Sequence, residues 1–190
     1  MKCGTHHIQT VKCNFKTLYY KQIKELKAEN FVSTGRIATG SKRGLLTSSP
    51  LGSCVAVVAY DVTTKIGGLA HVMLPGKSPK GNNNKYAENA ITNLIDELKN
   101  LGASKTNIEI CLVGGANVLR KKNDSIADYL INSIFEILKK KKLNVIASSL
   151  GGYERRTATL HLSSGVVNFT IGDSVEKKLY QFTSVRLRVP

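Results

Sequence analysis

The sequence contains few of the residues that mark secreted or membrane-spanning chains. It has no tryptophan, and only four cysteines and four prolines among 190 residues. No apolar run approaches the roughly 20 residues that a membrane-spanning helix needs, and the opening residues MKCGTHHIQTVKC lack the apolar centre of a secretory signal. Four scattered cysteines do not make a disulfide framework in a chain of this length. Reduced thiols, a cytoplasmic location and no membrane insertion are therefore expected.

Acidic residues are also scarce: the chain has 13 Asp and Glu and 28 Lys and Arg, which gives a formal net charge of +15. The excess lies at the two ends, with +7 over residues 1–47, +1 over 51–119 and +7 over 120–190. Such a field favours an acidic partner, although a compositional bias toward Lys, Asn and Ile explains it equally well. Nucleic acid is not expected as that partner, because no binding motif or aromatic platform occurs.

The remaining composition is that of one globular domain, with 42% hydrophobic and 22% charged residues. The basic leader predicts one helix, YYKQIKELKAENF, which ends at Phe31. Residues 33–50 predict loops around a short strand, since Gly, Ser and Pro separate short apolar pieces. The leader also holds four residues of zinc-ligand type, in a spacing that matches no strong pattern: Cys3, His6, His7 and Cys13. No metal site is expected.

Two β-type runs, SCVAVVAYDV (53–62) and IGGLAHVML (66–74), flank a short polar connection and predict a hairpin. Two amphipathic helices are predicted further along the chain. The first ends before Gly102 and buries Ala87, Ala90, Ile91, Leu94, Ile95 and Leu98. The second spans 125–141, begins with the capping pair Ser125 and Asp128, and buries Ile126, Leu130, Ile134, Phe135 and Leu138. Further strands are predicted at 108–115, 144–150, 157–163 and 166–171.

This pattern predicts an α/β (α+β) fold, a layered sandwich of mixed, largely antiparallel β-sheets flanked by helices. Within it, Cys54 and His71 are the two side chains of the hairpin that can do chemistry. We place Asp61 opposite Ile66. In this register Cys54 and His71 are diagonal neighbours on one face of the sheet, about 7–8 Å apart at the backbone. A slip of one residue would put them on opposite faces.

A cysteine is mostly protonated at neutral pH, because its usual pKa is about 8.5. A neighbouring imidazole can take this proton and later return it to a leaving amine. Gly52 and Ser53, just before Cys54, allow a tight turn whose backbone N–H groups can stabilise an oxyanion. A buried structural cysteine and a core histidine are the alternative that the residue types alone leave open.

The order of five motifs separates these alternatives. LGSCVAVVAYD, IGGLAHVMLP, KYAENAITNLIDELKNLGA, VGGANVL and LGGYERR follow one another between residues 51 and 156. With them, the chain resembles the chemoreceptor glutamine deamidase family, CheD. The resemblance implies a CheD-like domain over 32–172, a basic extension over 1–31, and a tail over 173–190 that packs on the domain or extends from it. It also implies the layered fold of the necrotising-factor deamidase toxins.

The resemblance implies that Cys54 is the nucleophile and His71 the base. The family's third catalytic member is usually a threonine five or six positions before the cysteine, and it orients the histidine. Those positions hold Ser49 and Ser48, preceded by Thr47. Ser48 is predicted to take the role, since a serine hydroxyl can make the same hydrogen bond, and Thr47 and Ser49 remain alternatives.

Other family positions have open roles. Gly114, Gly115 and Asn117 match the family, and a tight turn explains them without substrate contact. Arg156 matches a recurrent family arginine, whereas Tyr153 replaces a family asparagine. The family's Ile-Gly-x-Arg-Asn segment is replaced by IADYL at 126–130, which leaves that edge of the site open.

The resemblance implies hydrolysis of protein glutamine side chains to glutamate and ammonia through a Cys54 thioester, without a metal or organic cofactor. The expected substrates are methyl-accepting chemotaxis receptors, a CheC phosphatase is the second candidate partner, and a monomer is expected. Two alternatives stay open. One is methylester hydrolysis on the same receptors, and the other is a non-catalytic regulator that docks on receptors or on CheC.

Overall fold

The structure is a computed structural model and describes residues 29–120 and 126–183. Its helices are α2 (Ala87–Asn100) and α3 (Ile126–Lys140), with a 3-10 helix at Lys105–Asn107. Its strands are β1 (Glu29–Phe31), β2 (Ile37–Ser41), β3 (Leu45–Leu51), β4 (Val55–Asp61), β5 (Ile66–Val72), β6 (Ile108–Gly114), β7 (Asn144–Leu150), β8 (Arg156–His161), β9 (Val166–Ile171) and β10 (Lys177–Gln181). No helix in this part of the chain is long and apolar enough to cross a membrane.

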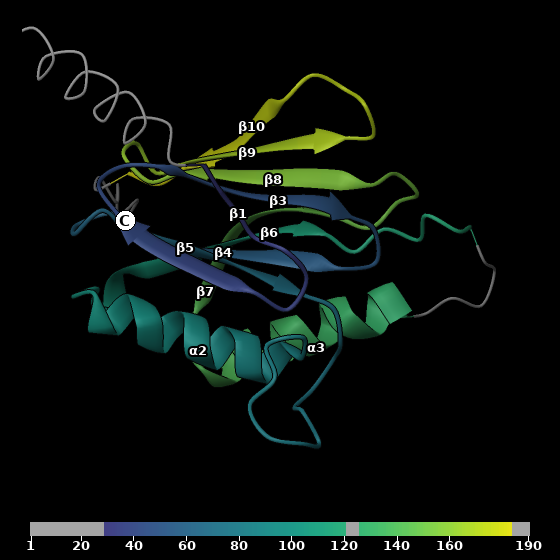
Figure 1. Cartoon of the computed structure of the whole chain (residues 1–190), viewed down its shortest axis with the longest axis horizontal. Coiled ribbons are helices and arrows are strands. Elements are labelled where there is room, and N and C mark those ends of the chain that lie inside the picture. The colour runs from purple at the N-terminus through teal and green to yellow at the C-terminus, as the bar shows by residue number, and fades with distance from the viewer. Residues whose placement is uncertain (1–28, 121–125, 184–190) are drawn as a thin grey trace, which may run out of the picture.

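The strands form two sheets that pack face to face, and both helices cover the outer face of one of them (Figure 1). The first sheet has the order β1-β3-β8-β9-β10 and the second β2-β5-β4-β6-β7. Neighbouring strands are antiparallel apart from the parallel pairs β1–β3 and β6–β7. The predicted layered α+β fold with largely antiparallel sheets is confirmed. Its similarity to the necrotising-factor toxins stays a prediction.

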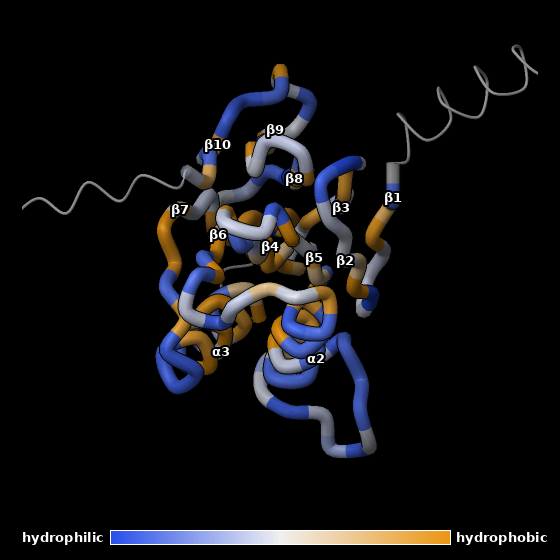
Figure 2. Tube along the Cα trace, turned by 90° about the vertical axis from the view of Figure 1, so that its left-hand side faces the viewer, coloured by the Kyte–Doolittle hydropathy of each residue, from blue (hydrophilic) through white to orange (hydrophobic). Residues whose placement is uncertain are grey.

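Two apolar layers hold the sandwich together. One lies between the sheets and includes Leu46, Val58 and Leu160, and the other lies between the second sheet and the helices and includes Val57 and Leu94. Strands β4 and β5 are buried along their whole length, because one face of each meets each layer. In Figure 2 hydrophobic colour gathers in the middle of the molecule, where strands and helices face one another, and hydrophilic colour prevails in the loop between β5 and α2.

Helix α2 buries all six predicted positions. Gly102, just beyond its end, has a φ of 105°, a conformation that suits a glycine after a helix. Helix α3 departs from its prediction, because Ile126 is 54% exposed and Phe135 41% exposed, so these two burial predictions are wrong. Both lie off the stripe that faces the sheet, which consists of Ala127, Leu130, Ile134, Ile137 and Leu138. The predicted cap Ser125 lies outside the described residues.

The segment before the hairpin contains more strand than the sequence predicted. Glu29–Phe31, the end of the predicted leader helix, forms β1 instead, and the rest of that helix lies outside the described residues. Residues 37–41 and 45–51 form two strands rather than one short one. Strand β1 exists because it pairs with β3, and such a tertiary contact overrides the local helical spacing.

The segment after β9 returns to the sandwich. Strand β10 pairs with β9, and the Phe182 ring stacks on that of Tyr60 with centroids 5.1 Å apart. Phe182 is only 3% exposed. Residues 184–190 of the predicted tail lie outside the described residues, and the division into extension, domain and tail stays a prediction.

A buried carboxylate closes the turn between β4 and β5. Asp61 is fully buried, and its Oδ1 accepts the backbone N–H groups of Thr63 and Thr64 at 2.9 and 3.3 Å. Its Oδ2 accepts the N–H of Ser104 at 2.9 Å, beyond the end of α2. Three backbone donors thus compensate its burial, and they tie the hairpin to the helix layer.

Asp61→Asn is expected to lower the free energy of unfolding by about 1–3 kcal/mol, because an amide N–H₂ would face a backbone N–H donor. Urea denaturation of both proteins measures the difference. Asp96→Asn is the control, since Asp96 forms an exposed ion pair with Lys99, and it should change stability by less than about 0.5 kcal/mol. Equal stability of the two variants would contradict this account of the turn.

Candidate active site

Cys54 lies on the short crossover that carries the chain from one sheet to the other. Strand β3 belongs to the first sheet and β4 to the second, and residues 52–54 connect them (Figure 1). Ser53 is exposed and Cys54 partly buried. Within the described residues, neither of their backbone N–H groups has a backbone or side-chain acceptor. Both groups can therefore donate to an oxyanion.

The hairpin has the predicted register, since Asp61 pairs with Ile66. Cys54 packs against the apolar layer between the sheets, and the His71 side chain reaches β3 across that layer. Both side chains thus lie on the same face of the second sheet, as diagonal neighbours do. No hydrogen bond joins the thiol to the ring within the described part of the chain.

His71 is only 2% exposed, and its ring has a polar neighbour at each nitrogen. Nδ1 lies 2.8 Å from Ser48 Oγ and 3.3 Å from the Val32 carbonyl oxygen. The Ser48 hydroxyl is fully buried and lies 2.8 Å from the same carbonyl. Nε2 lies 3.3 Å from Thr34 Oγ1. The ring is therefore held between the second sheet, which carries it, and groups of the neighbouring sheet and turn.

These contacts favour the tautomer with its proton on Nδ1. The Nδ1–H then donates to Ser48, the Ser48 hydroxyl donates to the Val32 carbonyl, and every group is paired. In the other tautomer Ser48 would have to donate to Nδ1, which would take the hydroxyl proton away from Val32. The first arrangement leaves the lone pair on Nε2, where a general base needs it.

Burial sets the resting charges of the pair. It raises the pKa of the Cys54 thiol. Burial also lowers the pKa of His71, with the hydrogen bond to Val32 acting in the opposite direction. Both shifts favour a neutral thiol beside a neutral imidazole. A thiolate at Cys54 could form by proton transfer to this ring.

Among the three candidate hydroxyls, Ser48 is the one that contacts the imidazole. Ser49 Oγ instead lies 2.8 Å from Thr157 Oγ1 on β8. Thr47 and Ser49 lie on the other face of β3, because neighbouring residues of a strand alternate. The geometry thus brings Ser48 together with His71 and leaves the other two apart from it.

The loop after β6 presses against the backbone of the crossover. Gly115 N–H donates to the Cys54 carbonyl and Ala116 N–H to the Gly52 carbonyl, both at 2.8 Å. Gly114 has a φ of 124°, and a Cβ there would overlap the Cys54 carbonyl oxygen. A side chain at this position would push the backbone of Cys54 away. The loop therefore donates hydrogen bonds to two carbonyls of the crossover. It leaves the N–H groups of Ser53 and Cys54 available to another acceptor.

Arg156 braces the next loop, between β7 and β8. Its side chain is buried and donates from Nε to Ser149 Oγ at 3.0 Å and from Nη1 to the Gly151 carbonyl at 2.6 Å. Gly151 N–H in turn donates to the Gly114 carbonyl at 3.0 Å. Arg156 thus supports the crossover of Cys54 through two loops, without reaching the thiol itself.

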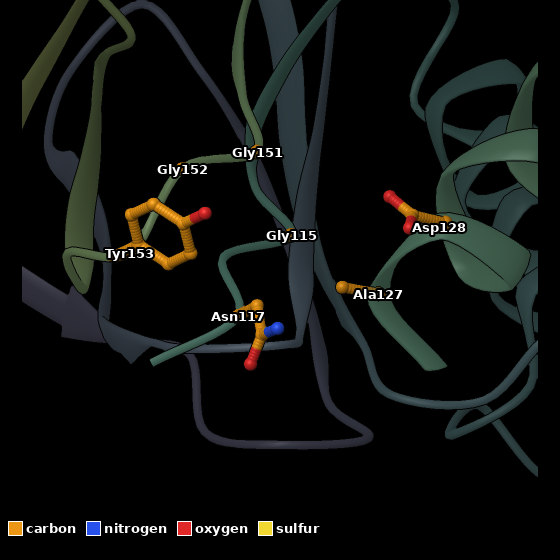
Figure 3. A pocket seen from close by; sticks show the side chains of 7 residues that line it. All are labelled: Gly115, Asn117, Ala127, Asp128, Gly151, Gly152 and Tyr153. Carbon is orange, nitrogen blue, oxygen red and sulfur yellow. The ribbon is translucent and has the colours of Figure 1, made fainter. Parts of the chain in front are cut away.

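A pocket of about 260 Å³ opens beside these loops (Figure 3). Asn117 N–H donates to the Gly152 carbonyl at 2.8 Å and ties two of its walls together. In Figure 3 the side chains of Tyr153 and Asp128 lie on opposite sides of the opening. The lining consists of Gly115, Asn117, Ala127, Asp128, Gly151, Gly152 and Tyr153. The pocket is next to the crossover but does not include Cys54.

Cys111 is the other free thiol of the described residues, and it is unsuited to attack. It is fully buried in β6, and burial, with a contribution from the Glu109 carboxylate, raises its pKa to about 12. No cluster of three or more potential metal ligands occurs among the residues that the structure describes. The four zinc-type residues of the leader lie outside them.

Sequence reasoning missed the turn that contacts the imidazole. Val32 contributes a main-chain carbonyl, which every residue type has, and Thr34 is one hydroxyl among many. The turn is tied to β5 by Gly35 N–H to the His71 carbonyl at 2.9 Å and by His71 N–H to the Arg36 carbonyl at 3.1 Å. No local pattern of the sequence signals these contacts.

Comparison with known proteins places the chain in a family. A family model described as CheD chemotactic sensory transduction matches residues 73–170, beginning just after His71. A probable chemoreceptor glutamine deamidase CheD from Chlorobium luteolum is 38% identical over 160 residues, 83% of this chain and 80% of that protein. One from Pyrococcus abyssi is 36% identical over 157 residues, 78% of this chain and 96% of that protein. The chemoreceptor glutamine deamidase CheD of Thermotoga maritima is 33% identical over 137 residues, 70% of this chain and 86% of that protein. The chain described here therefore belongs to the CheD family.

Proposed function

We propose that this protein is a chemoreceptor glutamine deamidase, which hydrolyses side-chain amides of glutamines on methyl-accepting chemotaxis receptors. The observation that carries the proposal is the hydrogen bond between Ser48 and His71, because it presents Nε2 as a base on the face that Cys54 shares. The names of the three relatives support the reaction and the substrate class.

In the first step, His71 Nε2 takes the thiol proton of Cys54 while the sulfur attacks the carboxamide carbon of a glutamine. The carbon–oxygen double bond opens into an oxyanion, which accepts hydrogen bonds from the N–H groups of Ser53 and Cys54. Gly52 allows the turn that aims these groups. Ser48 accepts the Nδ1–H of the imidazolium and keeps the ring in place.

In the second step, His71 gives the Nε2 proton to the amide nitrogen, the carbon–nitrogen bond breaks and ammonia leaves. A thioester on Cys54 remains. Water then gives a proton to Nε2 and attacks the thioester carbon, the carbon–sulfur bond breaks, and the thiolate recovers its proton from the ring. One water is consumed, and one ammonia and one glutamate side chain are formed.

Charge supports an acidic macromolecular substrate. The chain carries a net charge of +15, and glutamate-rich receptor segments carry the opposite sign. Opposite charges speed encounter, and salt screens them. The proposed encounter is therefore fast at low ionic strength and slower at high salt.

The finer points of the proposal rest on the family resemblance of the sequence. The protein acts as a monomer in the cytoplasm, and residues 32–172 form the catalytic domain. A CheC phosphatase binds over the active site in place of a receptor. Gly114, Gly115, Asn117 and Arg156 act by holding the loops around Cys54, which is the part their hydrogen bonds support.

Cys54→Ala and His71→Ala are each expected to abolish deamidation, because they remove the nucleophile and the base. The measurement is peptide mass of a receptor cytoplasmic fragment, which gains about one dalton for each glutamine converted to glutamate. Cys111→Ala is the matched control and should remain active. Normal deamidation by the Cys54→Ala protein would show that another group attacks, and release of methanol from a methylated receptor without deamidation would favour the esterase alternative.

Ser48→Ala is expected to lower kcat by about ten- to a hundredfold, because it removes the group that pairs both Nδ1 and the Val32 carbonyl in a buried site. Ser48→Thr keeps the hydroxyl and should retain most of the activity. Steady-state kinetics on the same receptor fragment compares the three proteins. An active Ser48→Ala enzyme would remove Ser48 from the catalytic group.

The acid limb of the pH profile of kcat/KM is expected to have its midpoint below about pH 6.5, the usual pKa of histidine. The base must be neutral, burial lowers the pKa of His71, and activity is therefore lost only when the pH falls through that lowered value. Initial rates between acidic and neutral pH test this. A midpoint above pH 6.5 would mean that a neighbouring negative charge, absent from this account, stabilises the imidazolium.

A further inference from the structure

We infer that Thr34 is a positioning residue for the base, because its hydroxyl holds the nitrogen of His71 that exchanges protons with Cys54. The inference rests on the proposed function, since it takes Nε2 as the acceptor of the thiol proton. The contact that carries it is the 3.3 Å approach of Thr34 Oγ1 to Nε2. With Ser48 at Nδ1, both ring nitrogens are then held by a hydroxyl.

The backbone holds Thr34 beside Nε2 of the ring. The turn that contains it bonds to β5 on either side, through Gly35 N–H to the His71 carbonyl and His71 N–H to the Arg36 carbonyl. The residue that carries the ring thus also anchors the turn that contacts the ring. Thr34 itself is exposed, so its hydroxyl lies where the buried imidazole meets the surface.

A second contact keeps this turn in place. Gly35 has a φ of 73°, and a Cβ there would crowd the Lys85 side chain, 2.6 Å from its Cγ. The Lys85 carbonyl accepts the N–H groups of Met73 and Leu74, at 2.9 and 2.8 Å, directly after β5. The turn therefore packs against Lys85, which is itself bonded to the residues that follow β5. Its position does not depend on the Thr34 side chain, which makes that side chain a clean target for substitution.

The hydroxyl suits both protonation states of Nε2. At 3.3 Å it donates a long hydrogen bond to the lone pair of the resting ring, which the thiol proton replaces, and after rotation it shares the Nε2–H of the imidazolium with the group that next receives this proton. A hydrogen bond to a charged donor is about twice as strong as one between neutral groups, so Thr34 favours the state in which Cys54 has lost its proton. Because the thiol makes no hydrogen bond to the ring here, Thr34 also orients Nε2 before the thiol approaches.

Thr34→Val keeps the shape of the side chain and removes the hydroxyl, whereas Thr34→Ser keeps the hydroxyl. Iodoacetamide alkylation of Cys54 at pH 7, followed by peptide mass, measures thiolate formation without any receptor, and receptor kinetics separates kcat from KM. We expect Thr34→Val to slow alkylation and to lower kcat about three- to tenfold with KM unchanged. Thr34→Ser should keep the alkylation rate and kcat within about twofold of the unchanged protein.

The ¹⁵N resonance of Nε2 should shift in the valine variant alone. Ser33→Ala, in the same exposed turn, is the matched control and should behave as the unchanged protein.

Wild-type alkylation and an unmoved Nε2 resonance in Thr34→Val would overturn the inference. A Thr34→Ser protein as slow as Thr34→Val would also overturn it, because the hydroxyl would not be the cause. Thr34→Ala repeats the test if valine disturbs the turn. Failure of the proposed function looks different, since His71→Ala would then leave alkylation of Cys54 unchanged.

Discussion

The hydrogen bond between Ser48 and His71 joins the two sheets, and the geometry of the candidate site depends on it. Both side chains are buried, so neither can satisfy its polar group with water. Ser48 and His71 each lie on a strand, where the side chains of the adjacent residues point to the opposite face. A slip of either strand by one residue would leave a hydroxyl or an imidazole unpaired in an apolar layer. The packing of the sandwich and the orientation of the His71 ring are therefore set by the same constraint.

A second constraint acts between backbones. The crossover of Cys54, the glycine loop after β6 and the loop before β8 are bonded in series, and buried Arg156 holds the far end. This series occupies the carbonyls of residues 52 and 54. Among the described residues, the N–H groups of Ser53 and Cys54 have no acceptor. Glycine is required at 114 because two main chains meet there without room for a side chain.

Burial also governs the electrostatics of the pair. It favours the neutral thiol and the neutral ring, so a reactive thiolate does not persist in the resting protein. In the proposed reaction, polar groups at the two ring nitrogens lower the cost of charge separation between thiol and ring. The net charge of +15 would act at longer range, on the proposed encounter with an acidic partner.

The sequence by itself determined the features that depend on neighbours along the chain. Helix α2, the hairpin and its register follow from periodicity and a short turn, and the ordered motifs around Cys54 and His71 indicate the family. Only the tertiary structure decided which of Thr47, Ser48 and Ser49 meets the ring, because that choice depends on how β3 faces the other sheet. It also decided that Glu29–Phe31 is a strand, that Phe135 stays exposed, and that Thr34 contacts Nε2 of the ring. Each of these follows from contacts between segments distant in the chain, whose energies local spacing does not contain.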